Sequence, residues 1–557
     1  MRRKVSLFLA IILSFMMILS GCSSEKTNTD AAAGTSTEQE SKENNEAKNV
    51  EQKLTFALQN EPDGLDPGIT NNSYASPFLC NVFEGLITYD VDNNLVPGNA
   101  ESWEISDDGL VYTFKLRDGL KWSDGSDLTA DDYIYSWKRV LNPKTAGKYV
   151  DMLTSYIKNA KEYYEGKCDE KDLGIKAVDK KTIEITLNAP TPFFLDVLSM
   201  WVYDPVKKDV VEAAPDRWAQ DAKTYISNGP FKISEMKFGE SVVLVKNENY
   251  WNAENVKLEE ITFRYILEQS TALSAFEAGE IDGSREVPPA DLPRLKAESD
   301  SLQIVPSFGT TYYLINNKVK PLDDVRVRKA LNLALDRTDL IENVLQSTDE
   351  PAFSIVSPGY MINGKDYTEG RPNHGIDAKA NVAEAKKLLA EAGYPDGKGF
   401  PVLRFSYSTN PIFKKVVEAM QQMWKQNLNI DMQISTEEWK VYYDNVQAGK
   451  YDIAQMGWGG DYLHPMTFLP LFVTDGTNNN SFYSNPKYDE LVAKAQSETD
   501  AVKAAAIMRE SEEVLMADYP FLPLFHRSFA FLMKPYVKGW GLTPLNNLYF
   551  KDAYIEK

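Results

Sequence analysis

Histidine and cysteine are scarce in this chain, which has three of each among 557 residues. The histidines, His374, His464 and His526, lie far apart, and no HExxH or CxxC pattern occurs. The sequence also has no GxSxG nucleophile elbow, no phosphate-binding P-loop and no GxGxxG turn. An SxxK pattern at residues 234–237 lacks both partner motifs of penicillin-binding enzymes. We therefore expect no catalytic residue, no metal site and no cofactor, and we do not expect an enzyme.

Positive charge is also in the minority, with 60 Lys and Arg against 81 Asp and Glu and a formal net charge of −21. No cluster of Lys or Arg follows the first four residues. Proteins bind nucleic acids mainly through such clusters, because the phosphate charges must be neutralised. The composition therefore predicts an acidic body without a nucleic-acid partner.

An apolar run at residues 5–19 follows Arg2, Arg3 and Lys4. With about 15 residues it is shorter than the roughly 20 that span a bilayer, so it favours an export signal over a membrane helix. The run ends in LSGC, residues 19–22, which resembles the lipobox of bacterial lipoproteins. The resemblance implies a signal peptide at residues 1–21 and a lipidated Cys22 that anchors the protein to the outer face of the cell membrane. Alternatively, Cys22 is an incidental residue after an ordinary cleaved signal.

Residues 23–49 consist almost entirely of Ser, Thr, Asn, Glu, Lys and Ala. Such a composition cannot form a core, so residues 22–52 are predicted to be the lipidated cysteine and a flexible tether. The body from residue 53 onward is longer than the roughly 250 to 300 residues at which single cores stop growing, which predicts two or three lobes. Cys80 lies in an apolar stretch and Cys168 in a polar one, and we expect both to be unpaired thiols.

Hydrophobic periodicity changes often along the body, which indicates an α/β or α+β class with many short elements. Three stretches alternate as strands do: residues 53–58, 111–116 and 182–187. Three others have helical patterns: residues 129–140 with Thr129 as cap, residues 323–335, and residues 380–392 ending at Gly393.

Five blocks stand out along the chain: EPDGLDP (61–67), the stretch from AESWEISDDG to WKRVLNP (100–143), SNGPFKI (227–233), NNKVKPLDDVRVRKALNLALDR (316–337) and GWGGDYLHP (457–465). In composition and order they resemble the signature of the bacterial extracellular solute-binding proteins of family 5, which serve peptide ABC importers. The likeness is greatest to oligopeptide-binding lipoproteins, and the blocks span most of the mature chain.

The resemblance implies an α/β fold like that of periplasmic binding proteins, in which a hinge joins two large lobes and a small α+β domain is inserted in the first lobe. Carried onto this chain, it divides the body into five segments: the start of lobe I (53–81), the inserted domain (82–189), the return of lobe I (190–309), lobe II (310–519) and the end of lobe I (520–557). Two chain crossings make a hinge.

Peptides differ in side chains but share a backbone, an amine and a carboxylate, so a receptor for many sequences must bind the shared groups. In the resembled family the acid of the GWGGDYLHP block meets the ligand's N-terminal ammonium, and Asp461 falls on that position. Trp458 and Gly459 fall on the backbone contacts, and glycine lets another backbone approach closely. Without the resemblance, Asp461 reads as an ordinary turn cap before Pro465.

The second wall of the site is expected just after the EPDGLDP block, where the resemblance implies a strand that pairs with the ligand. It would comprise Asn71, Asn72 and Ser73, with Tyr74 lining a pocket; alternatively, these residues form a polar surface turn. Tyr312 and Tyr313 are further pocket-lining candidates, and because neighbouring strand side chains point oppositely, only one of them would face the cleft. Arg404 and Lys440 carry no motif that selects them, so the sequence names no ligand for the peptide carboxylate.

These observations together predict a monomeric, membrane-anchored receptor that captures extracellular peptides and delivers them to the permease subunits of an ABC importer. The same fold could instead bind a nickel chelate, a sugar oligomer or a peptide pheromone. A cell-surface enzyme or adhesin is the alternative of another class, against which the missing catalytic groups argue.

Overall fold

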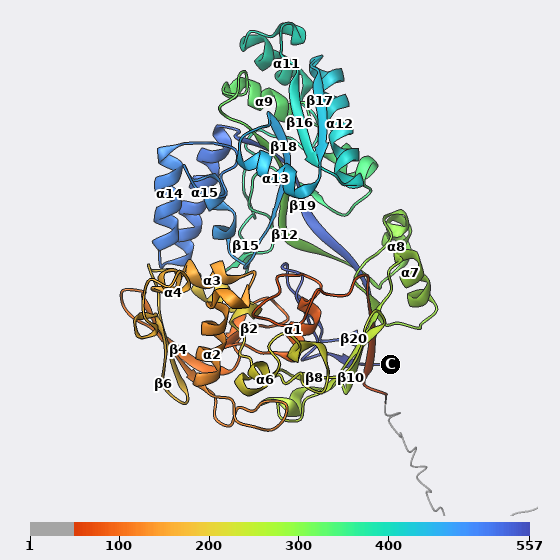
Figure 1. The fold of residues 1–557 in the computed structure, drawn as a ribbon. Coiled ribbons are helices and arrows are strands. Elements are labelled where there is room, and N and C mark those ends of the chain that lie inside the picture. Colours follow the sequence, from red (N-terminus) through yellow and green to blue (C-terminus); the bar gives the residue numbers. More distant parts are fainter. Residues whose placement is uncertain (1–49) are drawn as a thin grey trace, which may run out of the picture. The chain divides into compact units, whose positions relative to one another are not determined.

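The computed structural model of the protein describes residues 50–557 (Figure 1). The predicted signal peptide, Cys22 and nearly all of the tether lie outside the described residues. None of the helices within residues 50–557 combines the length and the apolar character needed to cross a membrane.

The largest element is an eleven-stranded mixed sheet with the order β17-β16-β18-β12-β19-β11-β1-β10-β9-β8, to which β13 adds by pairing with β19. Its strands are β1 Lys53–Leu58, β8 Phe231–Lys237, β9 Ser241–Lys246, β10 Glu260–Tyr265, β11 Gly283–Ser284, β12 Leu302–Ile315, β13 Glu350–Pro351, β16 Leu403–Ser408, β17 Met432–Glu437, β18 Ile453–Gly459 and β19 Phe521–Met533. We call the part with β1 and β8–β11 the first lobe and the part with β16–β18 the second lobe.

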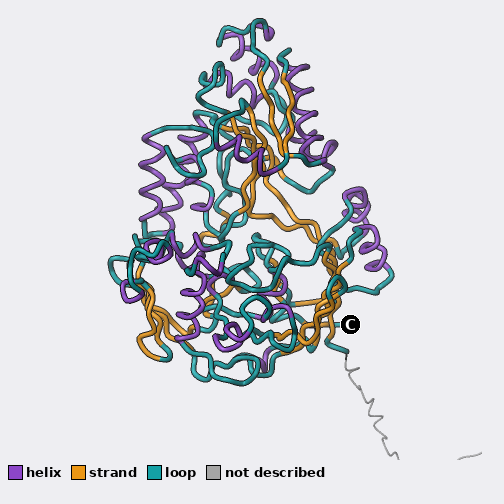
Figure 2. The backbone as a smooth tube through the Cα atoms, in the orientation of Figure 1, coloured by secondary structure: helices purple, strands orange, loops and turns teal. Residues whose placement is uncertain are grey.

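Two long antiparallel strands, β12 and β19, run through both lobes (Figures 1 and 2). Residues 302–306 of β12 pair with residues 528–532 of β19 in the first lobe, whereas residues 310–314 pair with residues 521–526 in the second. The register shifts between these two segments, so the crossing points are near residues 307–309 and at Arg527. The second crossing therefore lies after the predicted one at Pro520, because β19 begins as a strand of the second lobe.

A separate four-stranded antiparallel sheet has the order β4-β5-β7-β6 and lies within residues 82–189, where the inserted domain is predicted. Its strands are β4 Ala100–Ile105, β5 Val111–Leu116, β6 Ile175–Asp179 and β7 Thr182–Thr186. Helix α2 (Ala130–Val140) begins after Thr129, whose backbone N–H donates to the Asp132 carboxylate, a capping arrangement that closes the first turn. Trp137 of this helix is fully buried.

The other helices of the first lobe and inserted region are α1 Ser76–Val82, α3 Val150–Thr154, α4 Ala160–Tyr164, α5 Phe194–Leu198, α6 Lys208–Ala213, α7 Gln269–Glu277 and α8 Leu292–Glu298. Those of the second lobe are α9 Val325–Leu333, α10 Arg337–Asp339, α11 Val382–Glu391, α12 Pro411–Leu428, α13 Trp439–Gln447, α14 Pro486–Ser497 and α15 Ala501–Ala517. Short strand pairs complete the structure: β2 Ile87–Tyr89 with β3 Leu95–Pro97, β14 Met361–Ile362 with β15 Lys365–Asp366, β20 Val537–Lys538 with β23 Tyr554–Ile555, and β21 Gly541–Leu542 with β22 Leu548–Tyr549.

The core of the second lobe lies between its strands and helices α9, α11 and α12. Trp424 of α12 is fully buried there, and its indole N–H donates to the Leu331 carbonyl at 3.0 Å. Burying each large apolar side chain of this kind contributes about 1.5 to 3 kcal/mol. Strand β18, whose last three residues begin the GWGGDYLHP block, is thus part of a well-packed lobe.

The elements predicted from periodicity are confirmed. The stretches expected to be strands form β1, β5 and β7, and the three helical patterns form α2, α9 and α11. Gly393, which follows α11, has a φ of +100°, a left-handed conformation that favours glycine. Cys80 and Cys168 are free thiols, as expected.

Candidate functional site

One edge of β18 is open near its C-terminal end. On one side the strand pairs with β12 along its whole length, from Ile453 to Gly459. On the other side β16 pairs with it only at Ile453 and Ala454. The edge beyond these two residues has no strand neighbour in the described part of the chain, so its backbone groups can accept an added strand.

The direction of the backbone groups follows from two hydrogen bonds. The Gln455 carbonyl accepts from the Tyr442 hydroxyl of α13, which lies on the open side. The Gly460 N–H donates to the Phe308 carbonyl of β12, on the paired side. Because backbone groups alternate in direction along a strand, Gly457 and Gly459 present theirs to the open edge. Trp458, predicted to contact the ligand backbone, instead faces β12 with its N–H and C=O.

Gly459 is exposed, and a Cβ atom built on it would meet nothing within 4 Å. At Gly457 the same atom would lie 2.2 Å from Nη2 of Arg527. The absence of a side chain at residue 457 is therefore what lets the arginine reach this edge.

Asp461 follows the open edge directly. Its backbone N–H donates to Oγ1 of Thr467 at 3.2 Å, and the same oxygen accepts from the Trp458 indole at 3.1 Å. Within residues 50–557 no Lys, Arg or His nitrogen lies within 4.0 Å of the Asp461 carboxylate, and its oxygens accept no hydrogen bond. Burial, and then the charge of Asp151, raise the pKa of this carboxyl to about 7. An unpaired, partly buried carboxylate of this kind is suited to a cationic ligand group.

Aromatic residues connect the Asp461 segment to the inserted region and to Phe193, which follows it closely in sequence. The ring of Phe193 stacks on Tyr462 and on His464, with centroid distances of 5.5 and 4.8 Å. The Tyr462 hydroxyl also lies 3.2 Å from that of Tyr156. Burial, followed by the charge of Asp461, raises the pKa of Tyr149 in the same region. Tyr149 and Tyr156 of the inserted region therefore lie close enough to the Asp461 carboxylate to be influenced by its charge.

The expected ligand-pairing strand after the EPDGLDP block is not formed. Residues 71–75 are a turn ahead of α1, in which the Asn72 side chain accepts from the Tyr74 N–H at 2.8 Å. The Ser73 carbonyl accepts from the Arg285 guanidinium at 3.0 Å, and that guanidinium lies over the Tyr74 ring. Contact of Asn71, Asn72 and Ser73 with a ligand stays a prediction.

Tyr312 and Tyr313 point to opposite sides of β12, as neighbouring strand residues do. Tyr312 packs edge-on against Phe521 at 5.5 Å, and Tyr313 packs against Phe405 at 5.5 Å. The two rings are 3% and 1% exposed. Both therefore lie in packed cores, and a pocket-lining role for either stays a prediction.

Arg527 is the residue that sequence reasoning missed. It lies in the stretch FLPLFHRSFAFLM, where a charged residue in an otherwise apolar strand was an available signal. Which strand it would lie beside could not be read from that pattern.

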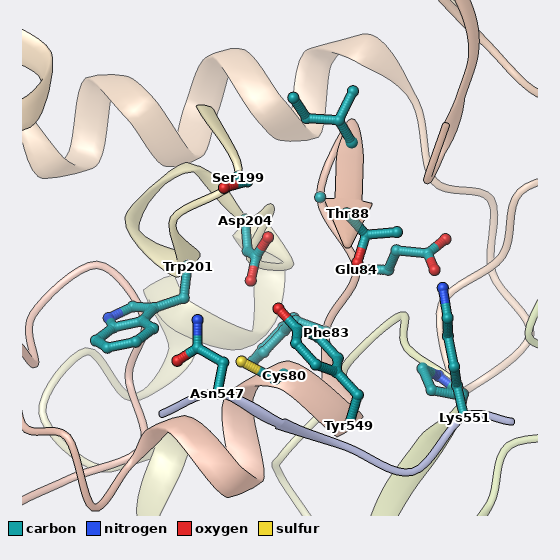
Figure 3. A pocket seen from close by; sticks show the side chains of 13 residues that line it. Cys80, Phe83, Glu84, Thr88, Ser199, Trp201, Asp204, Asn547, Tyr549 and Lys551 are labelled. Atoms are coloured by element: carbon teal, nitrogen blue, oxygen red, sulfur yellow. The ribbon is translucent and has the colours of Figure 1, made fainter. Parts of the chain in front are cut away.

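A small polar cavity lies apart from β18, in the first lobe (Figure 3). It measures about 30 Å³, enough for about two water molecules. Figure 3 shows Asp204, Asn547 and Tyr549 around it. Burial and the nearby Glu84 hold the pKa of Asp204 well above its ordinary range. The cavity is too small for a peptide and contains no predicted site residue.

Comparison with known proteins bears on the family and the fold. The model of bacterial extracellular solute-binding proteins, family 5, matches residues 94–480. The oligopeptide-binding protein OppA of Bacillus subtilis is 34% identical over 565 residues, covering 100% of both chains. The unliganded open form of MppA, a periplasmic murein tripeptide-binding protein, has a TM-score of 0.80 at 32% identity, covering 91% of this chain and 98% of that one. Haemophilus influenzae OppA in complex with RPPGFSPFR has a TM-score of 0.70 at 34% identity, covering 91% and 99%.

Proposed function

Because the chain belongs to family 5 of the bacterial extracellular solute-binding proteins, we propose that it captures peptides outside the cell and delivers them to an ABC importer. Three relatives that match over nearly their whole length carry the names of oligopeptide- or dipeptide-binding proteins, whereas a fourth, 32% identical, is named a probable deoxycholate-binding protein. The chain acts by binding and not by catalysis, and it works as a monomer.

The peptide backbone adds as a strand to the open edge of β18, opposite Gly457 and Gly459. Added strands bind through main-chain hydrogen bonds, which do not depend on ligand sequence. Each buried backbone group left without a partner would cost about 1 to 3 kcal/mol, so an extended backbone is the ligand that fits this edge.

The observation that carries the proposal is the unpaired carboxylate of Asp461 at the end of that edge. A peptide amine supplies the missing cation. Removing one partner from a buried charge pair typically costs about 3 to 5 kcal/mol. Asp461 thereby selects ligands that have a free N-terminus.

The receptor closes on its ligand by movement about β12 and β19, the two strands that connect the lobes. In support, the structural similarity to the open unliganded MppA (TM-score 0.80) is greater than that to the OppA–peptide complex (TM-score 0.70). Cys22 carries the lipid that holds the protein at the outer face of the membrane, and residues 23–52 are the tether.

Mass spectrometry of the natively purified protein tests the cargo. Family receptors that enclose their ligand keep it through purification when dissociation is slow. We expect a series of peptide masses released on denaturation. A released metal chelate, glycan or steroid, with no peptide, would overturn the proposal.

A further inference from the structure

Arg527 reaches from β19 across β12 to the open edge of β18. Its Nε donates to Oγ1 of Thr311 at 3.2 Å, and Thr311 is the direct partner of Gly457 in the sheet. The guanidinium then fills the space beside Gly457 that a side chain would otherwise occupy. The cation therefore lies over the face of β18 at Gly457, beside the edge to which a ligand strand would add and next to the crossing point of β19 between the lobes.

This guanidinium has no counterion among the residues that the structure describes. No carboxylate oxygen lies within 4.0 Å of it, and its Nη atoms donate no hydrogen bond to the protein. Burial lowers the pKa of Arg527, and the charge of the neighbouring Asp349 offsets only part of this effect. The oxygens of Asp349, however, already accept from the Ser528 backbone N–H at 2.9 Å and the Ser347 hydroxyl at 3.0 Å.

Arginine remains charged in proteins, and its planar donors match a carboxylate in a two-point contact. A partly buried arginine without a counterion is thus a recognition group for an anion. Four residue positions separate Gly457 from Asp461, which at roughly 3.3 Å per residue is about 13 Å along the edge. A ligand whose amine lies at Asp461 and whose chain runs back along β18 is antiparallel to it. At about 3.3 Å per residue, the main-chain carboxyl group of its third residue lies about 10 Å from the amine and that of its fourth about 13 Å, within reach of the Arg527 side chain.

We propose that Arg527 binds a carboxylate at the third or fourth residue of the ligand. The carboxylate is either the C-terminus of a tripeptide or tetrapeptide or an acidic side chain of a longer peptide. This inference rests on the proposed function, and it adds a preference for ligand length and charge.

Isothermal titration calorimetry with free-acid and C-amidated trialanine, tetra-alanine and penta-alanine tests the inference. In the wild-type protein, amidation of the tri- or tetrapeptide should weaken binding about 10- to 100-fold, as expected for charge-assisted hydrogen bonds. With Arg527→Gln, the same amidation should change affinity less than about twofold. Arg404→Gln, which removes an exposed arginine of β16 beside Asp452, should behave as the wild type.

Whether an acidic side chain supplies the carboxylate is tested with amidated pentapeptides that carry Glu or Gln at the third or fourth position in an alanine background. If only the Glu peptides gain affinity through Arg527, the carboxylate comes from the side chain. If neither amidation nor Glu-to-Gln exchange depends on Arg527, the inference is overturned.

Two controls separate the possible failures. Arg527→Lys keeps the charge but loses the two-point geometry, so it should retain part of the discrimination even if Arg527→Gln does not fold. If amidation weakens binding equally in the wild-type protein and in all variants, the proposed role of Arg527 is overturned, whereas the proposed function stands. If no peptide binds the wild-type protein, the proposed function fails as well.

Discussion

Asp461 is a carboxyl group whose proton affinity depends on whether the protein is folded. In the folded protein burial raises its pKa to about 7, whereas an unfolded chain leaves it near its usual value of about 4. Between these pH values the folded form holds a proton that the unfolded form releases. Stability contributed by this group is therefore lost as the pH rises from about 4 to 7.

Asp461→Asn removes this titration. We expect the stability of the variant relative to the wild type to increase between pH 5 and pH 8, by about 1 to 3 kcal/mol. Urea unfolding of ligand-free protein at both values measures the difference. Asp431→Asn, at an exposed residue paired with Lys425, is the matched control and should lack this pH-dependent gain. If Asp461→Asn changes the stability equally at pH 5 and pH 8, the pKa of this carboxyl is not raised in the folded protein.

At the scale of residues, the sequence was informative where a motif was local. Asp461 could be proposed as a site residue because one of the five blocks, nine consecutive residues long, contains it, and its role stays a prediction. Arg527 could not, because its position beside Gly457 depends on the pairing of β19 with β12 and of β12 with β18. Those pairings join residues 146 positions apart (Thr311 and Gly457) and 216 positions apart (Thr310 and His526), which local periodicity does not report.

The open edge of β18 depends on two glycines that have different surroundings. Gly457→Ala places a methyl group against Arg527, which must then leave its position, at a cost of about 1 kcal/mol for an altered rotamer. We expect about 2- to 10-fold weaker binding of free-acid tripeptides by calorimetry, with little change in melting temperature. Gly64→Ala, which lies away from β18 and whose methyl group also meets no protein atom, is the matched control. Equal affinity losses in the two variants would contradict the distinct role of Gly457.

Among the elements, strands with clear alternation, such as β1 and β5, were predictable from pattern alone. Asn71, Asn72 and Ser73 form no strand in the ligand-free protein, which agrees with the alternative of a polar turn, and their pairing with a ligand stays a prediction. A strand needs a neighbour for its backbone groups, and here the Asn72 side chain binds the Tyr74 N–H and favours a turn.

On the scale of the whole molecule, the α/β class and the two lobes followed from the resemblance and the chain length. The path between lobes did not: β19 starts in the second lobe and crosses at Arg527, whereas the crossing was expected at Pro520. The difference arises because β12 and β19 are single long strands shared by both lobes. A boundary inside a continuous strand leaves no turn signal in the sequence.

Membrane attachment is a property of the full chain. Cys22→Ser should move the protein from the membrane fraction to the soluble or secreted fraction, because the lipid chains supply the attachment. Peptide affinity should not change. Cys168→Ser, at a free thiol of the body, is the control and should stay with the membrane. Immunoblotting of cell fractions measures this, and a Cys22→Ser protein that remains with the membrane would contradict lipid anchoring.

The central claim is that a peptide's free amine lies at Asp461. It is tested most directly by calorimetry with one peptide, free or N-acetylated, on the wild-type protein and Asp461→Asn at pH 8, where the carboxyl is ionised. Each single change should weaken binding by about 10- to 1000-fold, and the two together should cost little more than either alone, because they remove the same contact. If the fold-loss in affinity for both changes together equals the product of the two single losses, the amine and this carboxylate do not meet.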